Sequence, residues 1–235
     1  MKNKSAVVVI AALSGLISWA LYLIVVRFPT MPMAASTQAG HVDSAWNGLL
    51  LVEGVIYAVV MAFLIYCVVA FRAAKRTEQG AKFDRSRGRV VEVAWIVGSA
   101  GLTLALAALG AHELRAIIGD GQADIDIEVR SSQFSWEFYY PQFKTFGDKL
   151  YLEKGKRHRL ILTSKDVIHA FWVPEFRIKQ DAVPGKAIPL IITPTTTGEY
   201  TLQCNQLCGR DHYNMLSIVA VLEHEDFEKS MKAEF

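Results

Sequence analysis

The sequence lacks three features that would each point to a particular class of protein. Its formal net charge is only +2 over 235 residues, so it has no strongly basic face of the kind that nucleic-acid binding requires. It contains no Cys-x-x-Cys-His motif, which excludes a covalently attached haem c in this chain. It also contains no internal repeat and no low-complexity segment. What remains is a chain of one or two domains in which the 52% hydrophobic residues are unevenly distributed.

Long apolar runs fill the first half of the chain, at about 5–26, 49–71 and 90–110. About 20 such residues cross a hydrocarbon core of about 30 Å, so each run is long enough to span a bilayer. Buried helices of a large soluble protein are the alternative, but three successive runs with so few ionisable residues favour a membrane. The first run could instead be a signal peptide, because the small-residue segment MAAS follows it. Its apolar core exceeds the roughly 7–15 residues typical of such peptides, which favours a retained helix.

Basic residues predict the orientation of these runs. The segment 72–89 holds seven Lys and Arg against two acids, and Lys2 and Lys4 precede the first run. The segment 28–46 contains neither Lys nor Arg. By the positive-inside rule, the N-terminus and segment 72–89 are cytoplasmic, and the chain from about residue 112 onward lies outside. That outer part is mildly acidic, with 15 Lys and Arg against 18 Asp and Glu in residues 113–235.

From Asp124 onward the pattern changes to short alternating segments. The segment DIDIEVR alternates strictly, which is typical of a half-buried strand. Similar segments follow between turn-prone residues: FSWEFYY, RLILTS, IPLIIT, YTLQC and SIVAVLE. Strands at this spacing predict a small sandwich or barrel, with only the tail EHEDFEKSMKAEF helical. The predicted fold class is therefore membrane-anchored all-β, with an N-terminal helix at 1–28, a transmembrane hairpin at 47–112 and an outer domain at 113–235.

One short segment of this outer domain, QCNQLCGRDHYNM, gathers Cys204, Cys208, His212 and Met215. Their spacing of four, four and three would place all four on one face of a helix. The Asn, Gly and Asp residues between them are poor helix formers, and strands flank the segment on both sides. The sequence therefore predicts a loop between two strands that carries four potential ligands.

Three kinds of site can be built from these side chains. A disulfide is the simplest, because the outer compartment is oxidising, but it leaves His212 and Met215 unexplained. Zinc would accept thiolate and imidazole, but a thioether is a poor zinc ligand. Copper fits the whole set, since thiolate and thioether favour Cu(I) and imidazole accommodates Cu(II). A mononuclear blue-copper site uses two His and one Cys, so this loop, with two Cys, is short of one imidazole.

The missing imidazole is expected from His169, which lies in the apolar and aromatic segment SKDVIHAFWVPEF. Taken alone, such a residue is more often a core histidine. Next to a loop that needs a second imidazole, a ligand becomes the better interpretation. Four further histidines lie near membrane boundaries or in polar stretches, and we expect none of them to bind the metal: His41, His112, His158 and His224.

Together, CNQLCGRDHYNM and DVIHAFWVPEF resemble subunit 2 of the haem-copper cytochrome c oxidases. The segments QFSWEFYYP and KQDAVPGK also occur in the family's order, so the resemblance covers about residues 47–222, and the helix at 1–28 lies outside the family's two-helix pattern. The resemblance implies a cupredoxin-like Greek-key β-barrel that holds a dinuclear copper centre, CuA. By position, Cys204 and Cys208 would bridge the two copper ions.

The remaining ligands follow from the same resemblance. His169 and His212 would each complete one copper ion, Met215 would be a weak ligand, and the backbone carbonyl of Gln206 would be another. In the family, position 206 is usually Glu, whose side chain reaches a magnesium ion at the contact with subunit 1. Magnesium prefers carboxylate oxygen, so Gln206 keeps the carbonyl for copper but does not support a magnesium site.

The resemblance also implies a function and partners. Cytochrome c or another small redox protein would reduce the copper, and the electrons would pass to haem in subunit 1, where oxygen becomes water. The family typically has Trp at position 134, where electrons enter; here it is Phe134, and Trp136 matches the second tryptophan of the segment. Glu92, three residues before a Trp as in the family, would lie at the mouth of a proton pathway into subunit 1, although a carboxylate there could also pair with Arg89.

Two other functions would use the same ligands. One is the copper-bearing subunit of a nitric oxide reductase. The other is a membrane-tethered copper carrier or assembly factor, which would bind copper without turnover. Carriers tend to use exposed and exchangeable sites, whereas this loop is expected to be buried between strands. Quinol oxidase subunits of this fold lack the copper ligands.

Overall fold

The computed structural model describes residues 2–28, 31–72, 85–119 and 122–233. Most of the basic segment predicted to be cytoplasmic, residues 73–84, lies outside the described residues. The chain divides into two compact units. One comprises Met1–Thr30 with Ala45–Ala111, and the other comprises Met31–Ser44 with His112–Phe235.

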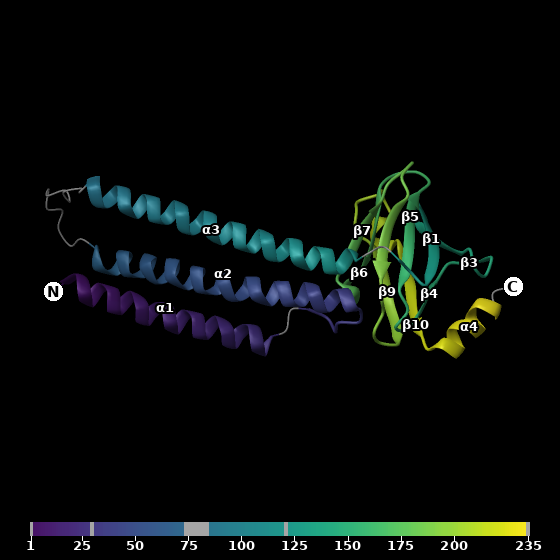
Figure 1. Ribbon diagram of the computed structural model, residues 1–235, viewed down its shortest axis with the longest axis horizontal. Helices are drawn as coiled ribbons and strands as arrows, with labels where there is room; N and C mark the ends of the chain where they lie inside the picture. The colour runs from purple at the N-terminus through teal and green to yellow at the C-terminus, as the bar shows by residue number, and fades with distance from the viewer. Residues whose placement is uncertain (1, 29–30, 73–84, 120–121, 234–235) are drawn as a thin grey trace. The chain divides into compact units, whose positions relative to one another are not determined.

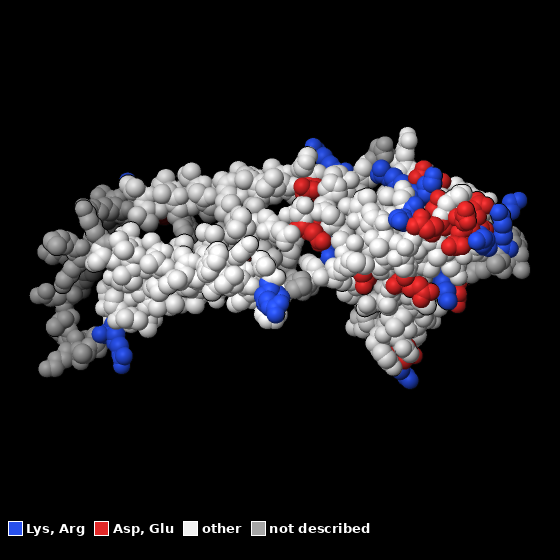
Figure 2. Space-filling model, turned by 90° about the horizontal axis from the view of Figure 1, so that it is seen from below, with Lys and Arg blue, Asp and Glu red and all other residues white. Residues whose placement is uncertain are grey.

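The first unit is built from α1 (Lys2–Arg27) and from most of two further long apolar helices, α2 (Thr37–Ala70) and α3 (Arg85–Ile118) (Figure 1). All three are long and apolar enough to cross a membrane. α2 and α3 each have 34 residues, or about 51 Å of helix, and so extend beyond the apolar runs. The helical surface seen in Figure 2 is almost free of charge, whereas acidic and basic side chains gather on the β domain. Such a surface is suited to hydrocarbon rather than to water.

The segment before α2 and the first turns of α2, residues 31–44, belong to the second unit. The Ser36 hydroxyl accepts a hydrogen bond from the backbone N–H of Ala39 (3.0 Å), which is the N-cap arrangement that starts a helix. Ser36 also forms a β-bridge with Pro194, and its hydroxyl donates to the carbonyl of Phe176 (3.0 Å). The first turn of α2 is thereby fastened to the β domain.

The described residues of the second unit form two five-stranded sheets. The first has the order β3-β2-β1-β5-β8 and the second has the order β4-β10-β9-β6-β7. The strand bounds are β1 (Ile125–Ser132), β2 (Ser135–Tyr140), β3 (Thr145–Gly147), β4 (Leu150–Glu153), β5 (His158–Ser164), β6 (His169–Val173), β7 (Ile178–Ala182), β8 (Ile188–Ile192), β9 (Gly198–Cys204) and β10 (Leu216–Leu222). Pairing is antiparallel except for β1 with β5 and β10 with β4. Sequence neighbours often lie in different sheets, as a Greek-key arrangement requires.

A single apolar core lies between the two sheets. Along β1, buried and partly buried residues alternate, so that Ile127 and Val129 point inward. Phe138 and Phe171 fill the centre, and the C-terminal helix α4 (His224–Ala233) adds Phe227 to the core. The prediction of N-terminal helices followed by a cupredoxin-like β domain is confirmed.

His158 is a buried residue within a segment of polar sequence. Its side chain is fully buried at the start of β5, although its neighbours in sequence are mostly basic. Nδ1 donates to the carbonyl of Lys156 (3.0 Å), and Nε2 accepts from the N–H of Glu153 (3.1 Å), so the neutral ring is satisfied. Burial lowers the pKa of His158 to about 4 because the charged ring would be poorly solvated.

Candidate metal centre

The candidate ligands come from three adjacent strands of the second sheet. His169 begins β6, Cys204 ends β9, and Met215 directly precedes β10. Phe171 of β6 pairs with Cys204, and the N–H of Cys204 donates to the carbonyl of Met215 (3.1 Å). The N–H of Asn205 donates to the carbonyl of Ala170 (3.0 Å). The loop 205–215 is therefore fixed at both ends by backbone hydrogen bonds.

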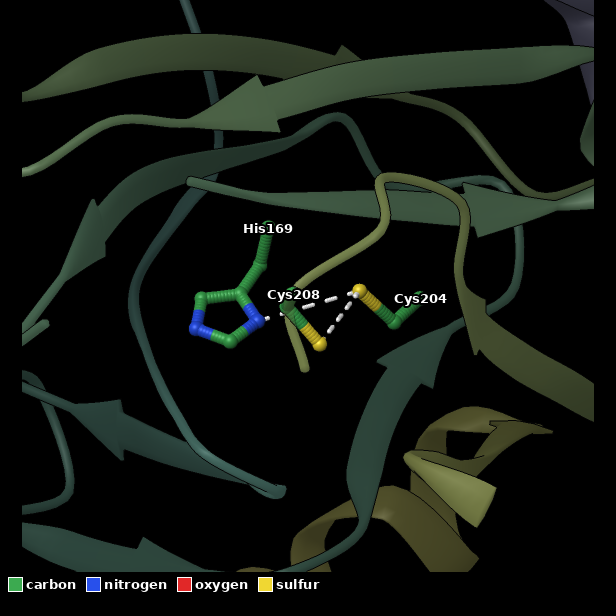
Figure 3. A group of neighbouring side chains, drawn as sticks. All are labelled: His169, Cys204 and Cys208. Atoms are coloured by element: carbon green, nitrogen blue, oxygen red, sulfur yellow. Dashed lines mark hydrogen bonds between the residues drawn. The ribbon is translucent and has the colours of Figure 1, made fainter. Parts of the chain in front are cut away.

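Three ligand atoms converge at the base of this loop, as Figure 3 shows. Nδ1 of His169 lies 3.8 Å from Sγ of Cys204, and the two cysteine sulfurs lie 3.9 Å apart. Within this group of three residues, all candidate ligand atoms lie within 4.8 Å of one another. A disulfide needs about 2.05 Å between the sulfurs, so both cysteines are free thiols here.

The other predicted ligands surround the same pair of sulfurs. Nδ1 of His212 lies 3.5 Å from Sγ of Cys208, and Sδ of Met215 lies 3.9 Å from it. The carbonyl oxygen of Gln206 accepts from the thiol of Cys204 at 3.4 Å. Each cysteine thus has one imidazole beside it. The structure brings all six predicted ligands together.

Burial disfavours free thiolates at this candidate site. His169 and Met215 are fully buried, and Cys204 and Cys208 are 8% and 5% exposed. Burial, followed by the nearby Cys204, raises the pKa of Cys208 to about 11, so without metal its proton stays on the sulfur. A metal ion must replace that proton to bind. Two sulfurs flanked by two imidazoles, a thioether and a carbonyl are a donor set that fits copper well and zinc poorly.

Two residues that the sequence did not predict support the ligands. Asp166 lies in the turn before β6, and its Oδ1 accepts from Nε2 of His169 (2.8 Å). Its Oδ2 accepts from the backbone N–H of Gln133 (2.7 Å), and the side-chain amide of Gln133 donates to the carbonyl of Cys208. Partial burial raises the pKa of Asp166, but hydrogen bonds from His169, Gln133 and Val167 outweigh it and lower that pKa to about 2.

The two aromatic residues predicted to carry electrons lie beside the ligands. Trp136 is buried, and its ring meets that of His169 edge to face, with centroids 6.3 Å apart. Phe134 is half-buried and lies over the loop: a Cβ added at Gly209 would come within 3.0 Å of its ring. Glu92 lies elsewhere, exposed on α3 in the helical unit. Among the described residues, no ion pair joins it to Arg89.

Part of the outer domain matches a known protein family. Residues 142–222 match the family described as cytochrome C oxidase subunit II, periplasmic domain. The chain is 26% identical over 246 residues to cytochrome c oxidase subunit 2 of Synechocystis sp., covering 84% of this chain and 74% of that one. It is 42% identical over 106 residues to cytochrome c oxidase subunit 2 of Thermostichus vulcanus, covering 45% of this chain and 32% of that one.

A solved structure is also similar to part of this chain. It is the periplasmic domain of subunit II of cytochrome oxidase (CoxB) of Bradyrhizobium japonicum, which is 28% identical. The match covers 48% of this chain and 94% of that one, with a TM-score of 0.46.

Proposed function

The chain belongs to the cytochrome c oxidase subunit 2 family, and from this premise we propose that it accepts electrons for a terminal respiratory oxidase. It is a membrane protein with an extracytoplasmic C-terminal domain. The observation that carries the proposal is the convergence of His169, Cys204 and Cys208 within 4.8 Å. The helices at 1–28 and 47–112 would lie in the lipid bilayer, and residues 113–235 would face the electron donor.

The six converging residues would hold a dinuclear copper centre. Cys204 and Cys208, as thiolates, would hold the two ions together with the imidazoles of His169 and His212. Met215 and the Gln206 carbonyl would be weaker ligands. When bound, such a pair of ions takes up and releases one electron at a time.

The protein's contribution is to hold these ligands still. Backbone hydrogen bonds fix both ends of the loop, so few atoms need to move when the charge on the centre changes. Trp136 packs against the fully buried His169, and the buried Phe171 packs against Trp136, so water is excluded from the imidazole. A dry and rigid surrounding keeps the cost of each electron transfer low, because no solvent has to reorganise.

Electrons would reach the ligands through the aromatic residues beside them. Trp136 contacts the His169 ring, and the half-buried Phe134 lies against Gly209 of the ligand loop. The donor would be cytochrome c or another small one-electron carrier. The mildly acidic outer domain suits a basic donor, because complementary charge speeds encounter.

The acceptor would be haem in subunit 1 of the complex, where oxygen is reduced to water. Glu92 on α3 would contribute to the proton pathway into that subunit. The side chain of Gln206 is exposed and carries no carboxylate, which gives magnesium a poor ligand at that contact. A nitric oxide reductase could use the same copper ligands, and the catalytic subunit that co-purifies with this chain distinguishes the two.

A copper carrier fits the site less well. Carriers exchange metal through exposed sulfur, whereas Cys204, Cys208 and Met215 are buried. Buried ligands held by paired strands favour a resident cofactor over cargo.

Copper loading of the full-length chain tests the proposal. We expect two copper ions per chain and a purple species whose unpaired electron is shared by both ions in its EPR spectrum. Cys204→Ser or Cys208→Ser should abolish this signal. Cys67→Ser is the matched control, because Cys67 lies in α2, and it should leave the signal unchanged. One copper ion per chain, or a Cys204–Cys208 disulfide in the copper-loaded protein, would contradict the proposal.

A further inference from the structure

Arg177 has a backbone conformation that is unusual for a residue with a side chain. It directly follows the short 3₁₀ helix Pro174–Phe176 at the end of β6, and its φ of 57° and ψ of 24° lie in the left-handed region. Of the described residues other than glycine, Lys144 and Arg177 alone have a positive φ. Glycine adopts this region freely, whereas a Cβ makes it costly. An arginine in this conformation therefore points to a use for its side chain.

The Arg177 side chain is 5% exposed, and all three of its nitrogen atoms donate hydrogen bonds. Nε and Nη2 donate to the two carboxylate oxygens of Asp43 (2.8 and 3.3 Å), which is a bidentate ion pair. Nη2 also donates to the carbonyl of Pro32 (2.6 Å), and Nη1 donates to that of Pro174 (2.9 Å). One guanidinium thus joins the end of the strand that carries His169 to the segment before α2 and to the second turn of α2.

Backbone hydrogen bonds hold the start of α2 against the same domain. The N–H of Ala35 donates to the carbonyl of Glu175 (2.9 Å), and the carbonyl of Ala35 accepts from the N–H of Thr195 (2.9 Å). Two residues later, the N–H of Thr37 donates to the carbonyl of Thr193 (3.0 Å). These bonds fix the point at which α2 begins.

A contact at one end of a helix leaves the direction of the helix free, and a second contact farther along removes that freedom. Asp43 lies six residues after Thr37, or about 9 Å farther along the helix axis, so its ion pair with Arg177 is such a second contact. α2 continues without a break beyond Asp43, and it enters the helical unit at Ala45. The ion pair therefore lies where the helix leaves the β domain.

We propose that Arg177 is a positioning residue, whose ion pair with Asp43 fixes the direction of α2 relative to the strand that begins with His169. The consequence rests on the proposed function, in which α2 is anchored in the oxidase and His169 binds copper. One electron would then leave the copper centre and reduce the haem of the partner subunit, and this step slows steeply as the distance grows. A fixed junction keeps that distance constant. Uptake of the electron from the donor does not depend on the junction, because the candidate ligands all lie within the β domain.

The first test measures the junction in the copper-free, full-length chain. Spin labels introduced as unnatural amino acids at Ser44 and Lys149, two exposed residues of one unit, should give a narrow distance distribution. Arg177→Gly removes the guanidinium but suits the left-handed backbone, so the domain should stay folded. The distribution should widen about twofold, because a buried paired charge is lost.

Two further variants show whether the ion pair is the cause. Asp43→Asn should also widen the distribution, and the double variant should be no wider than Arg177→Gly alone, since both changes remove the same contact. Arg130→Met is the matched control, because Arg130 forms ion pairs with Glu128 and Glu137 within its own sheet. It should leave the distribution at its wild-type width.

The second test follows electrons in the complex of the full-length chain with its partner subunits. In Arg177→Gly, the copper EPR signal and the rate of copper reduction by the donor should stay at their wild-type values. Transfer from copper to haem should slow about 3- to 30-fold, since a misplacement of about 1 Å can cost about 100-fold in rate. Arg130→Met should change neither rate.

Four results would overturn the inference: a wild-type distribution in Arg177→Gly, equal widening in Arg130→Met, unchanged transfer from copper to haem, or equal slowing of both electron steps. If the wild-type complex took up no electron at copper, the proposed function would fail instead. The distance measurement would still decide whether Arg177 fixes the direction of α2, because it uses the copper-free chain.

Discussion

The carboxylate of Asp166 lies 2.8 Å from Nε2 of His169, while Nδ1 of the same ring faces the sulfur of Cys204 at 3.8 Å. A neutral imidazole carries one proton, and the hydrogen bond to Asp166 keeps that proton on Nε2. The lone pair of Nδ1 then points toward the cysteines. Asp166 therefore selects the tautomer that a metal needs, without touching the metal.

Removing this carboxylate should weaken copper binding. We expect Asp166→Ala to lower the copper affinity of the full-length chain about 10- to 100-fold, because the His169 ring loses both its fixed tautomer and its fixed orientation. Asp166→Asn keeps a hydrogen-bond acceptor, so its copper affinity should lie between those of the wild type and Asp166→Ala. Copper titration measures the effect. Asp148→Ala, an exposed aspartate in the turn before β4, is the control and should bind copper as the wild type does.

The contact between Gln133 and the ligand loop leads to a second prediction. A Cβ on residue 209 would lie 2.8 Å from the side-chain nitrogen of Gln133, and Gly209 has a φ of +150°. Gly209→Ala should therefore lower the free energy of unfolding by about 1–3 kcal/mol and shift the copper EPR signal. Adding Gln133→Ala removes one of the two clashes and should restore part of the lost stability. A double variant no more stable than Gly209→Ala alone would show that Gln133 does not constrain the loop.

The residues that converge at the candidate site could be predicted from sequence, whereas the residues that support them could not. Cys204 and Met215 lie in one short loop, so their types and spacing already indicate a copper site. Gln133 lies 75 residues from its partner Cys208, and no local pattern connects the turn after β1 with the ligand loop. Asp166 could have been predicted more easily, because it precedes His169 by only three residues and a contact within one turn is a local feature.

The burial of His158 was not predicted from the sequence for a different reason. The segment around His158 looks polar because Lys and Arg surround it, but those side chains are exposed or partly exposed whereas His158 is buried. The alternation of His158, Leu160 and Leu162 on the buried face of β5 was the available signal. A period of two describes a strand better than average polarity does.

That buried histidine predicts a pH dependence of stability. Burial lowers the pKa of His158 from 6.5 to about 4, so between these values the unfolded chain binds a proton that the folded chain does not. The contribution of His158 to stability is therefore present above about pH 6.5 and is lost as the pH falls toward 4, by about 3 kcal/mol in total. Denaturant unfolding of the copper-free chain at pH 7.5 and pH 5 should show about 2 kcal/mol of this loss, because pH 5 lies 1.5 units below the pKa of the unfolded chain.

A variant separates His158 from the other titrating groups. His158→Gln should flatten the pH dependence between 7.5 and 5, whatever its stability at pH 7.5. His112→Gln, at an exposed position on α3, should leave the slope as it is. An unchanged slope in His158→Gln would mean that other groups cause the dependence.

Gln206 should tolerate loss of its side chain. Its carbonyl oxygen faces Cys204 at 3.4 Å, but its side chain is exposed. Gln206→Ala should therefore keep two copper ions per chain, with an affinity within about twofold of the wild type. Complete loss of copper would show that the amide side chain, and not the backbone, supports the site.

Glu92 should affect turnover but not copper. Its side chain lies on α3 in the helical unit, apart from the ligands, so electron uptake by the outer domain does not depend on it. If it supplies protons to the haem-bearing subunit, Glu92→Ala should slow oxygen consumption several-fold while stopped-flow reduction of the copper centre keeps its wild-type rate. Glu225→Ala, an exposed acid on α4, is the control for loss of one negative charge and should change neither rate. A wild-type rate of oxygen consumption in Glu92→Ala would remove Glu92 from the proton pathway. Slowed reduction of the copper centre would show that Glu92 acts through the fold. A residue that only delivers protons cannot delay an electron that has not yet reached the haem.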